Sequence, residues 1–360
     1  IRRNEKTKDV IGFNGQYQEN REFGYEHLLS PYAAIQNGLF FVRQHKLRPT
    51  LTVNAGLRVD YSSIDISEFY APVWNRSREI EYYSQRNENI QKEFLNYSAS
   101  AGFSWFPFTD WNVKANLGRS FRIPTAAELS INGVHHGTFR HELGNKDLNS
   151  EKGYQLDLGL IMRKKNLDIS FSPYLNYFED YIYLSPTSNF GYVDQTGSLV
   201  LLPEAGQTFQ YKQDNAVITG FEFLSDYHLV KDLHYEIAVE YVYKYNLNSE
   251  LPLPFTPPAS VQNSLDYRWR TGFINWNAGI QWKHYFDQNN VDRNELSTPG
   301  YDFFNINAGI SRKIGKREVS AYFKIRNVFD QRYFNHLSRY RLLNLPEQGR
   351  DFMIQTVFKF

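Results

Sequence analysis

Apolar and polar side chains alternate residue by residue in many segments of this chain, and the alternation continues to its last residue. In residues 350–360 (RDFMIQTVFKF), apolar side chains occupy most alternate positions from Phe352 to Phe360, whereas Asp351 and Lys359 lie on the opposite face. This period predicts a β-strand with one face against an apolar medium and the other against water. A soluble β-sandwich allows such a strand. A chain that stops on the last aromatic residue is more typical of the strand that closes a membrane barrel.

The same pattern recurs along the chain and predicts fourteen strands. Leu57 and Val59, for example, alternate with Arg58 and Asp60. Charge is nearly confined to one face, as contact with lipid requires, because a charged side chain at the bilayer midplane costs about 2–4 kcal/mol. The strands are expected at residues 5–18, 32–44, 49–61, 94–106, 111–121, 151–163, 166–183, 213–228, 232–245, 261–271, 273–286, 301–313, 317–328 and 350–360.

The connections between these strands alternate between short and long. The short ones include residues 45–48, 107–110, 164–165, 229–231 and 314–316. The long ones include residues 62–93, 122–150, 184–212, 246–260 and 287–300. Tight turns at one end and long loops at the other predict an all-β fold, an antiparallel transmembrane β-barrel whose long loops face outside.

Composition agrees with a barrel and excludes several functions. Aromatic residues make up 17% of the chain, the mean hydropathy is −0.56, and no apolar run approaches the roughly 18 residues of a membrane helix. The net charge of +1 offers no electrostatic footprint for nucleic acid, and the absence of cysteine excludes disulfides and thiolate metal sites. No catalytic or nucleotide-binding motif is present, so neither an enzyme nor a cofactor is expected.

Two motifs in and beside the predicted loop at residues 122–150 point to a family. Residues 121–129 (FRIPTAAEL) and then 144–151 (GNKDLNSE) resemble the TonB-dependent outer-membrane receptors, which often carry F-R-x-P-T-x-x-E-L followed by G-N-x-x-L-x-x-E. Residues 327–333 (NVFDQRY) and the terminal Phe360 add to the likeness. The resemblance implies the bacterial outer membrane and a barrel of about 22 strands with a plugged lumen.

By this resemblance, residues 1–360 are expected to form the C-terminal part of a transmembrane β-barrel domain, with the plug and the early strands outside this chain. A start at Ile1, with neither Met nor signal peptide, fits a processed chain or a fragment. The implied function is energy-coupled uptake of a scarce nutrient, with a metal ion or a metal chelate (siderophore, haem, zinc or copper) as the preferred class. The implied partners are outer-membrane lipid, the ligand, an energy-coupling inner-membrane protein reached through the plug, and the barrel-assembly machinery, which reads the C-terminal strand.

Two other functions stay open at this point. Fourteen strands could close as a complete, smaller barrel that acts as a passive channel. A soluble β-rich module that binds carbohydrate is also compatible with the alternation.

The stretch 135–142 holds the densest group of metal-competent side chains. His135, His136 and His141 are the candidate metal ligands, because imidazole suits zinc and copper. Adjacent side chains point apart in an extended loop, so His135 and His136 can reach one ion only around a turn. A solvated loop without metal is the alternative. The full set of candidate ligand-binding residues in the predicted outer loops is His135, His136, Phe139, Arg140, His141, Glu142, Tyr192 and His336.

Overall fold

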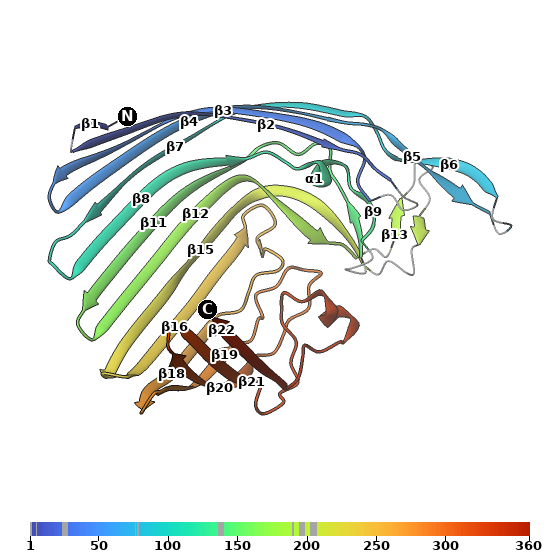
Figure 1. Ribbon diagram of the computed structural model, residues 1–360. Helices are drawn as coiled ribbons and strands as arrows, with labels where there is room; N and C mark the ends of the chain where they lie inside the picture. Colours follow the sequence, from blue (N-terminus) through green and yellow to red (C-terminus); the bar gives the residue numbers. More distant parts are fainter. Residues whose placement is uncertain are drawn as a thin grey trace.

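The computed structural model describes residues 2–4, 6–23, 28–75, 77, 79–135, 140–188, 191–193, 199–201 and 207–360. In these residues, all fourteen predicted strands are present as long strands of one curved antiparallel sheet (Figure 1). They are β2 (Thr7–Asn20), β3 (Tyr32–Arg48), β4 (Leu51–Ile66), β7 (Ile90–Trp105), β8 (Trp111–Arg122), β11 (Glu151–Lys164), β12 (Leu167–Pro186), β15 (Thr208–Val230), β16 (Leu233–Asn246), β18 (Ser260–Thr271), β19 (Ile274–Tyr285), β20 (Tyr301–Ile314), β21 (Arg317–Arg326) and β22 (Asp351–Lys359).

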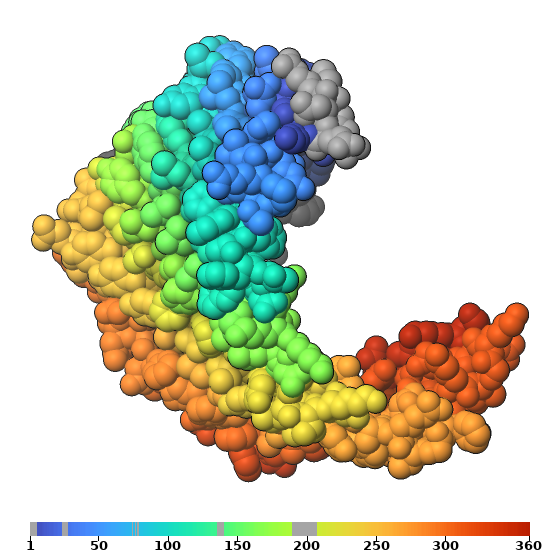
Figure 2. All heavy atoms as spheres, turned by 90° about the vertical axis from the view of Figure 1, so that its left-hand side faces the viewer, coloured from blue at the N-terminus to red at the C-terminus, as the bar shows by residue number. Residues whose placement is uncertain are grey.

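Each long strand pairs with the next long strand along the chain, so the sheet is a continuous meander from β2 to β22. Figure 2 shows this wall as an open arc, with N-terminal residues along one edge and C-terminal residues along the other. Among the described pairings, none joins β22 to β2. We call the concave side of the arc the lumen side.

The two ends of the sheet differ as the loop lengths predict. At one end, two-residue or slightly longer turns join the strands, and Gly272 and Gly315 take positive φ angles of 58° and 63° there, which glycine adopts at little cost. At the other end, the long connections contain short elements. These are β5 (Phe69–Trp74), β6 (Ile80–Asn87), α1 (Ala126–Ser130), β9 (Asn132–His135), β10 (Arg140–Leu143), β13 (Gly191–Val193), β14 (Leu199–Leu201), β17 (Leu251–Pro252) and η2 (Arg339–Leu343), and β1 (Arg2–Asn4) precedes β2.

The outward face is apolar in the middle of the strands, and the lumen face is polar. Leu117 of β8 is 63% exposed and lies in register with Ala101 and Leu156. Its neighbour Asn116 lies on the opposite face, in register with Asp157. At the end of the chain, Phe352, Ile354 and Phe358 share the outward face of β22 and are exposed. No described helix is long and apolar enough to cross a membrane.

Near the long-loop end, the lumen face becomes apolar. Ile64 and Ile66 of β4 are buried together with Leu129 of α1 and Ile182 of β12. This small core forms where a loop packs against the inside of the wall. It explains why β4 runs to Ile66, whereas the sequence predicted an end at residue 61, since the outward-apolar pattern stops before the strand does.

Candidate functional site

The connection between β8 and β11 folds over the lumen side at the long-loop end. After α1, it forms the antiparallel hairpin β9–β10, and β10 then pairs in parallel with the first residues of β15, from His141 opposite Thr208 to Leu143 opposite Gln210. In the sheet, β11 and β12 lie between β8 and β15. The hairpin therefore connects the end of β8 to β15, although these strands are not neighbours in the sheet. It lies over part of the lumen at the long-loop end (Figure 1).

The FRIPTAAEL motif holds this covering loop in place. Nη1 of Arg122 donates to both carboxylate oxygens of Glu128 at 2.8 Å, and Nη2 donates to Glu151 Oε2 at 3.2 Å. Glu128 also completes a capping box with Thr125 at the start of α1. The same Glu151 oxygen accepts the backbone N–H of Ile182 at 2.9 Å. One guanidinium thus joins the end of β8, the short helix and the start of β11.

The β10 strand buries an ion pair beside a histidine. Nε of Arg140 donates to Glu142 Oε1 at 2.5 Å, both side chains are 6% exposed, and the guanidinium lies over the ring of Phe209. Nε2 of His141 donates to Oδ1 of Asn132 at 3.0 Å. Burial, with the nearby charge of Arg86, lowers the pKa of His141 to about 4, so this imidazole is neutral at pH 7.

A second buried network joins the β19–β20 loop to the β21–β22 loop. Glu295 Oε1 lies 3.2 Å from Nε2 of His336 and accepts from Nη2 of Arg341 at 3.0 Å. The hydroxyl of Thr298 lies 2.8 Å from Nδ1 of His336 and accepts from Arg341. His336 is 1% exposed and the Glu295 side chain 3%. This histidine therefore fastens two loops together.

The structure places the predicted site residues in different settings. The hairpin register pairs His135 with Arg140 and His141 with Val134, so the two histidines hold register positions of opposite parity. His136 and Phe139 lie outside the described residues, as do the side chains of His135 and Tyr192, whose backbones belong to β9 and β13. Four of the candidates, Arg140, His141, Glu142 and His336, are buried. Metal ligation by His135, His136 and His141 stays a prediction.

A depression of about 430 Å³ lies beside the hairpin. It is lined by the end of β6, the α1–β9 connection and the residues that follow β10, including Arg86, Glu88 and Lys146. The Lys146 ammonium donates to Glu88 at 2.5 Å on its rim. A hollow of this size with a few charged groups matches the dimensions of small-ligand sites.

Sequence reasoning missed the partners that immobilise these loops. Nothing local marks Glu295 as the partner of His336, because the pairing exists only once two long loops meet. The sequence motifs contain Arg122, Glu128 and Glu151, but they did not predict that these three side chains contact one another. The strict spacing of Thr125 and Glu128 is the one local signal, since it predicts a capping box.

An antiparallel sheet with an apolar outward band, a polar lumen face, tight turns at one end and folded loops at the other defines the wall of a transmembrane β-barrel. The sequence of residues 7–328 matches the family model described as TonB dependent receptor-like, beta-barrel. The chain belongs to this family, whose members are receptors of the bacterial outer membrane and not enzymes.

Solved structures share the fold at low sequence identity. The copper transporter OprC superposes with a TM-score of 0.77 at 19% identity, over 99% of this chain and 54% of that one. The FrpB iron transporter from Neisseria meningitidis (F3-3 variant) gives 0.67 at 16%, over 99% and 53%. The ferric yersiniabactin uptake receptor FyuA from Yersinia pestis gives 0.63 at 12%, over 99% and 51%. The chain spans about half the length of these matched structures.

Proposed function

We propose that this chain forms the outer-membrane wall and ligand-binding loops of a receptor that takes up a metal ion or a metal chelate by TonB-dependent energy coupling. The observation that carries the proposal is family membership across residues 7–328. Its substrate class is supported by structures of the same fold that are named for copper, iron and a ferric siderophore. Membership favours a receptor over the passive channel and the soluble module that the sequence left open.

The loop geometry supports capture at the long-loop end. The buried ion pairs of β10 and of Glu295 hold the loops in fixed positions over the lumen, and preorganised loops lose less entropy when a ligand binds. The buried candidates Arg140, His141, Glu142 and His336 act in this proposal by holding the loops. In this proposal the ligand is contacted by His135 at the end of β9, by His136 and Phe139 in the connection that follows, and by Tyr192.

Energy-coupled uptake is tested in cells that carry or lack the gene. Ferric siderophores, haem, Zn²⁺ and Cu²⁺ are offered one at a time, and accumulation is measured with the energy-coupling protein present or deleted. We expect one of these ligands to accumulate only when both the receptor and the coupling protein are present. Accumulation that continues without energy coupling, or a steady open conductance of the full-length receptor in a planar bilayer, contradicts the proposal.

The metal contact proposed for the β9–β10 connection has its own test. The full-length receptor with His135→Ala and His136→Ala is expected to lose affinity for Zn²⁺ or Cu²⁺, because two borderline nitrogen ligands are removed. His284→Ala, which alters a histidine paired with Asp302 at 3.0 Å in another part of the wall, is the control. Unchanged affinity in the double variant refutes metal contact at this loop.

Placement of the sheet in a membrane predicts the effect of a charge on its outward face. Leu117→Arg puts a guanidinium in the middle of the apolar band and should destabilise the folded receptor in lipid vesicles by about 2–4 kcal/mol. Asn116→Arg is the matched control, because its side chain faces the lumen in register with Asp157. The two variants are compared by urea titration of folding into vesicles. Equal stability of both would contradict lipid contact at Leu117.

A further inference from the structure

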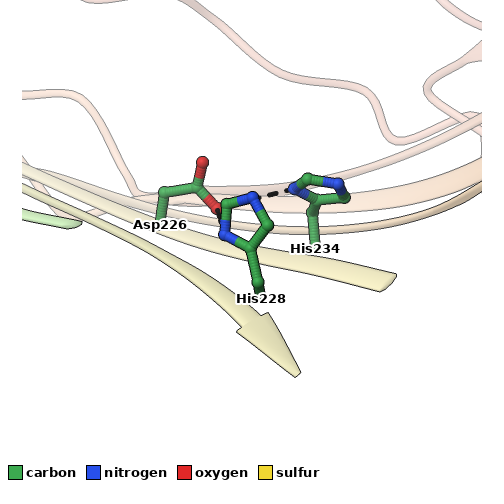
Figure 3. Close-up of side chains that lie close together, drawn as sticks. All are labelled: Asp226, His228 and His234. Atoms are coloured by element: carbon green, nitrogen blue, oxygen red, sulfur yellow. Dashed lines mark ion pairs between the residues drawn. The ribbon is translucent and has the colours of Figure 1, made fainter. Parts of the chain in front are cut away.

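Two histidines and an aspartate converge on the lumen face at the short-turn end, far along the strands from the covering loops. His228 of β15 and His234 of β16 are opposite each other in the ladder, and Asp226 precedes His228 by two residues on the same face (Figure 3). The imidazole centroids are 4.2 Å apart. Among the described residues, these three alone form a group of metal-competent side chains whose ligand atoms all lie within 4.8 Å of one another.

The strand register explains why these side chains meet. Residues two apart on a strand share a face, and directly opposed residues on neighbouring strands are the closest pairs that a sheet offers. A register shift directly after His228 lets the strand turn into β16, and the backbone N–H of His228 is held by the carbonyl of Asn166 at 2.9 Å. The backbones of both histidines are therefore fixed by hydrogen bonds between neighbouring strands.

The ligand atoms are spaced almost as a metal ion requires. Asp226 Oδ1 lies 3.8 Å from Nδ1 of His228 and 3.9 Å from Nδ1 of His234. In a tetrahedral zinc site with bonds of about 2.0–2.1 Å, neighbouring ligand atoms are about 3.4 Å apart. Small rotations of the side chains close this difference. The present distances are too long for hydrogen bonds.

Two of these ligand atoms have no hydrogen-bond partner in the described structure. Asp226 Oδ1 and His228 Nδ1 are shielded from water and accept or donate no hydrogen bond there. Buried polar atoms are nearly always paired, and one that is not calls for an ion or a water. A metal ion between them satisfies both atoms together with His234.

The surrounding charges favour a cation. Asp168 and Glu236 are in register with Asp226 on either side, and Asp266 is in register with His234. All three carboxylates belong to the same face as the cluster. Arg163, in register with Asp168, offsets one of them, and the remaining carboxylates leave a negative potential around the cluster.

We propose that Asp226, His228 and His234 form a binding site for a divalent transition-metal ion of the zinc and copper class on the lumen face near the short turns. Two imidazole nitrogens and one carboxylate oxygen are a ligand set that these ions prefer, and three protein ligands leave a coordination position open for water or for a passing ligand. A role for this site in uptake rests on the proposed function, whereas metal binding itself does not.

Metal binding is tested on the full-length receptor in detergent, purified with a tag that contains no histidine and stripped with a chelator. Zn²⁺ is titrated in competition with a chromophoric chelator. We expect His228→Gln/His234→Gln to bind one equivalent fewer, and Asp226→Asn to bind at this site at least about tenfold more weakly, since even the loss of outer-shell support costs about 10–100-fold. Co²⁺ should give the intense visible absorption of a tetrahedral site in the parent protein but not in the double variant.

His45→Gln is the matched control, because His45 lies at the same end of the sheet, bonded to Thr7 on a different strand pair. It should bind Zn²⁺ as the parent does. Heat-dependent migration in gels verifies that each variant folds. An unchanged Zn²⁺ stoichiometry and Co²⁺ spectrum in folded His228→Gln/His234→Gln overturns the site. This outcome is separate from failure at the outer loops, because unchanged affinity in the His135→Ala/His136→Ala variant concerns the proposed function alone.

Discussion

Replacing Glu295 with alanine is expected to release the β19–β20 and β21–β22 loops from each other. The carboxylate is the common partner of His336 and Arg341, and all three side chains are almost fully buried. Its removal leaves a buried guanidinium without its counter-charge, and breaking such a pair costs about 3–5 kcal/mol. The hydrogen bonds between the long strands do not depend on this contact, so we expect the lost free energy to destabilise the two loops locally and not the sheet.

Hydrogen exchange of residues 287–300 and 327–350 in the full-length receptor measures this loss. Glu88→Gln serves as the control, because its pair with Lys146 is about half exposed on both sides and exposed ion pairs contribute little to stability. We expect exchange in both loops to accelerate strongly in Glu295→Ala and barely in Glu88→Gln. Equal protection in the two variants would show that Glu295 does not hold the loops.

The same contact predicts how the loops respond to acid. Burial by itself raises the pKa of Glu295, but His336, the N–H of Phe255 and Arg341 outweigh it and leave the pKa below the ordinary value of 4.5. The open loop therefore takes up a proton at a higher pH than the docked loop. Docking is at full strength above pH 4.5 and weakens as the pH falls through the lower, docked-state value. Exchange in the two loops should rise in that acid range, and Glu295→Gln should remove the dependence.

The strands could be predicted from the sequence because their causes are local. Alternation and turn residues are written in consecutive positions, and every predicted strand overlaps one long strand of the sheet. One error lies at the short-turn end, where residues 45–48, expected as a turn, belong to β3; the others lie at the long-loop end, where β4 and β15 extend beyond the predicted limits. There the lumen face carries Ile64 and Ile66, so the outward-apolar rule no longer holds.

The candidate site could be predicted only in outline, because its contacts join segments that are distant in sequence. The sequence identified His141 and His336 as chemically capable. It did not indicate that His141 contacts Asn132 or that His336 contacts Glu295. The first contact depends on the hairpin register, and the second depends on two long loops lying side by side. The pairing of His228 with His234 was the more accessible case. The strands predicted on either side of their short turn already bring both residues to the same end of one hairpin.

Replacing Arg122 with alanine is expected to undock α1 and the loop that covers the lumen. Glu128 and Glu151 are 13% and 10% exposed, and the guanidinium is the shared partner that keeps these two carboxylates together. Without it, the carboxylates repel each other in a poorly hydrated space. Because Arg122 itself is partly exposed, we expect a cost of about 2–3 kcal/mol, below the range of about 3–5 kcal/mol for a fully buried pair.

Thr125→Ala separates this effect from the cap alone. That variant removes the hydroxyl that accepts the N–H of Glu128 at the start of α1, which costs about 1 kcal/mol, but keeps the ion pairs. Arg122→Lys keeps the charge but cannot reach both carboxylates in the forked geometry, so its effect should lie between the other two. Protease cleavage within residues 123–150 and hydrogen exchange of α1 rank the three variants. If Arg122→Ala is no worse than Thr125→Ala, the arginine is not what holds the helix to the wall, and the small core around Leu129 must hold it instead.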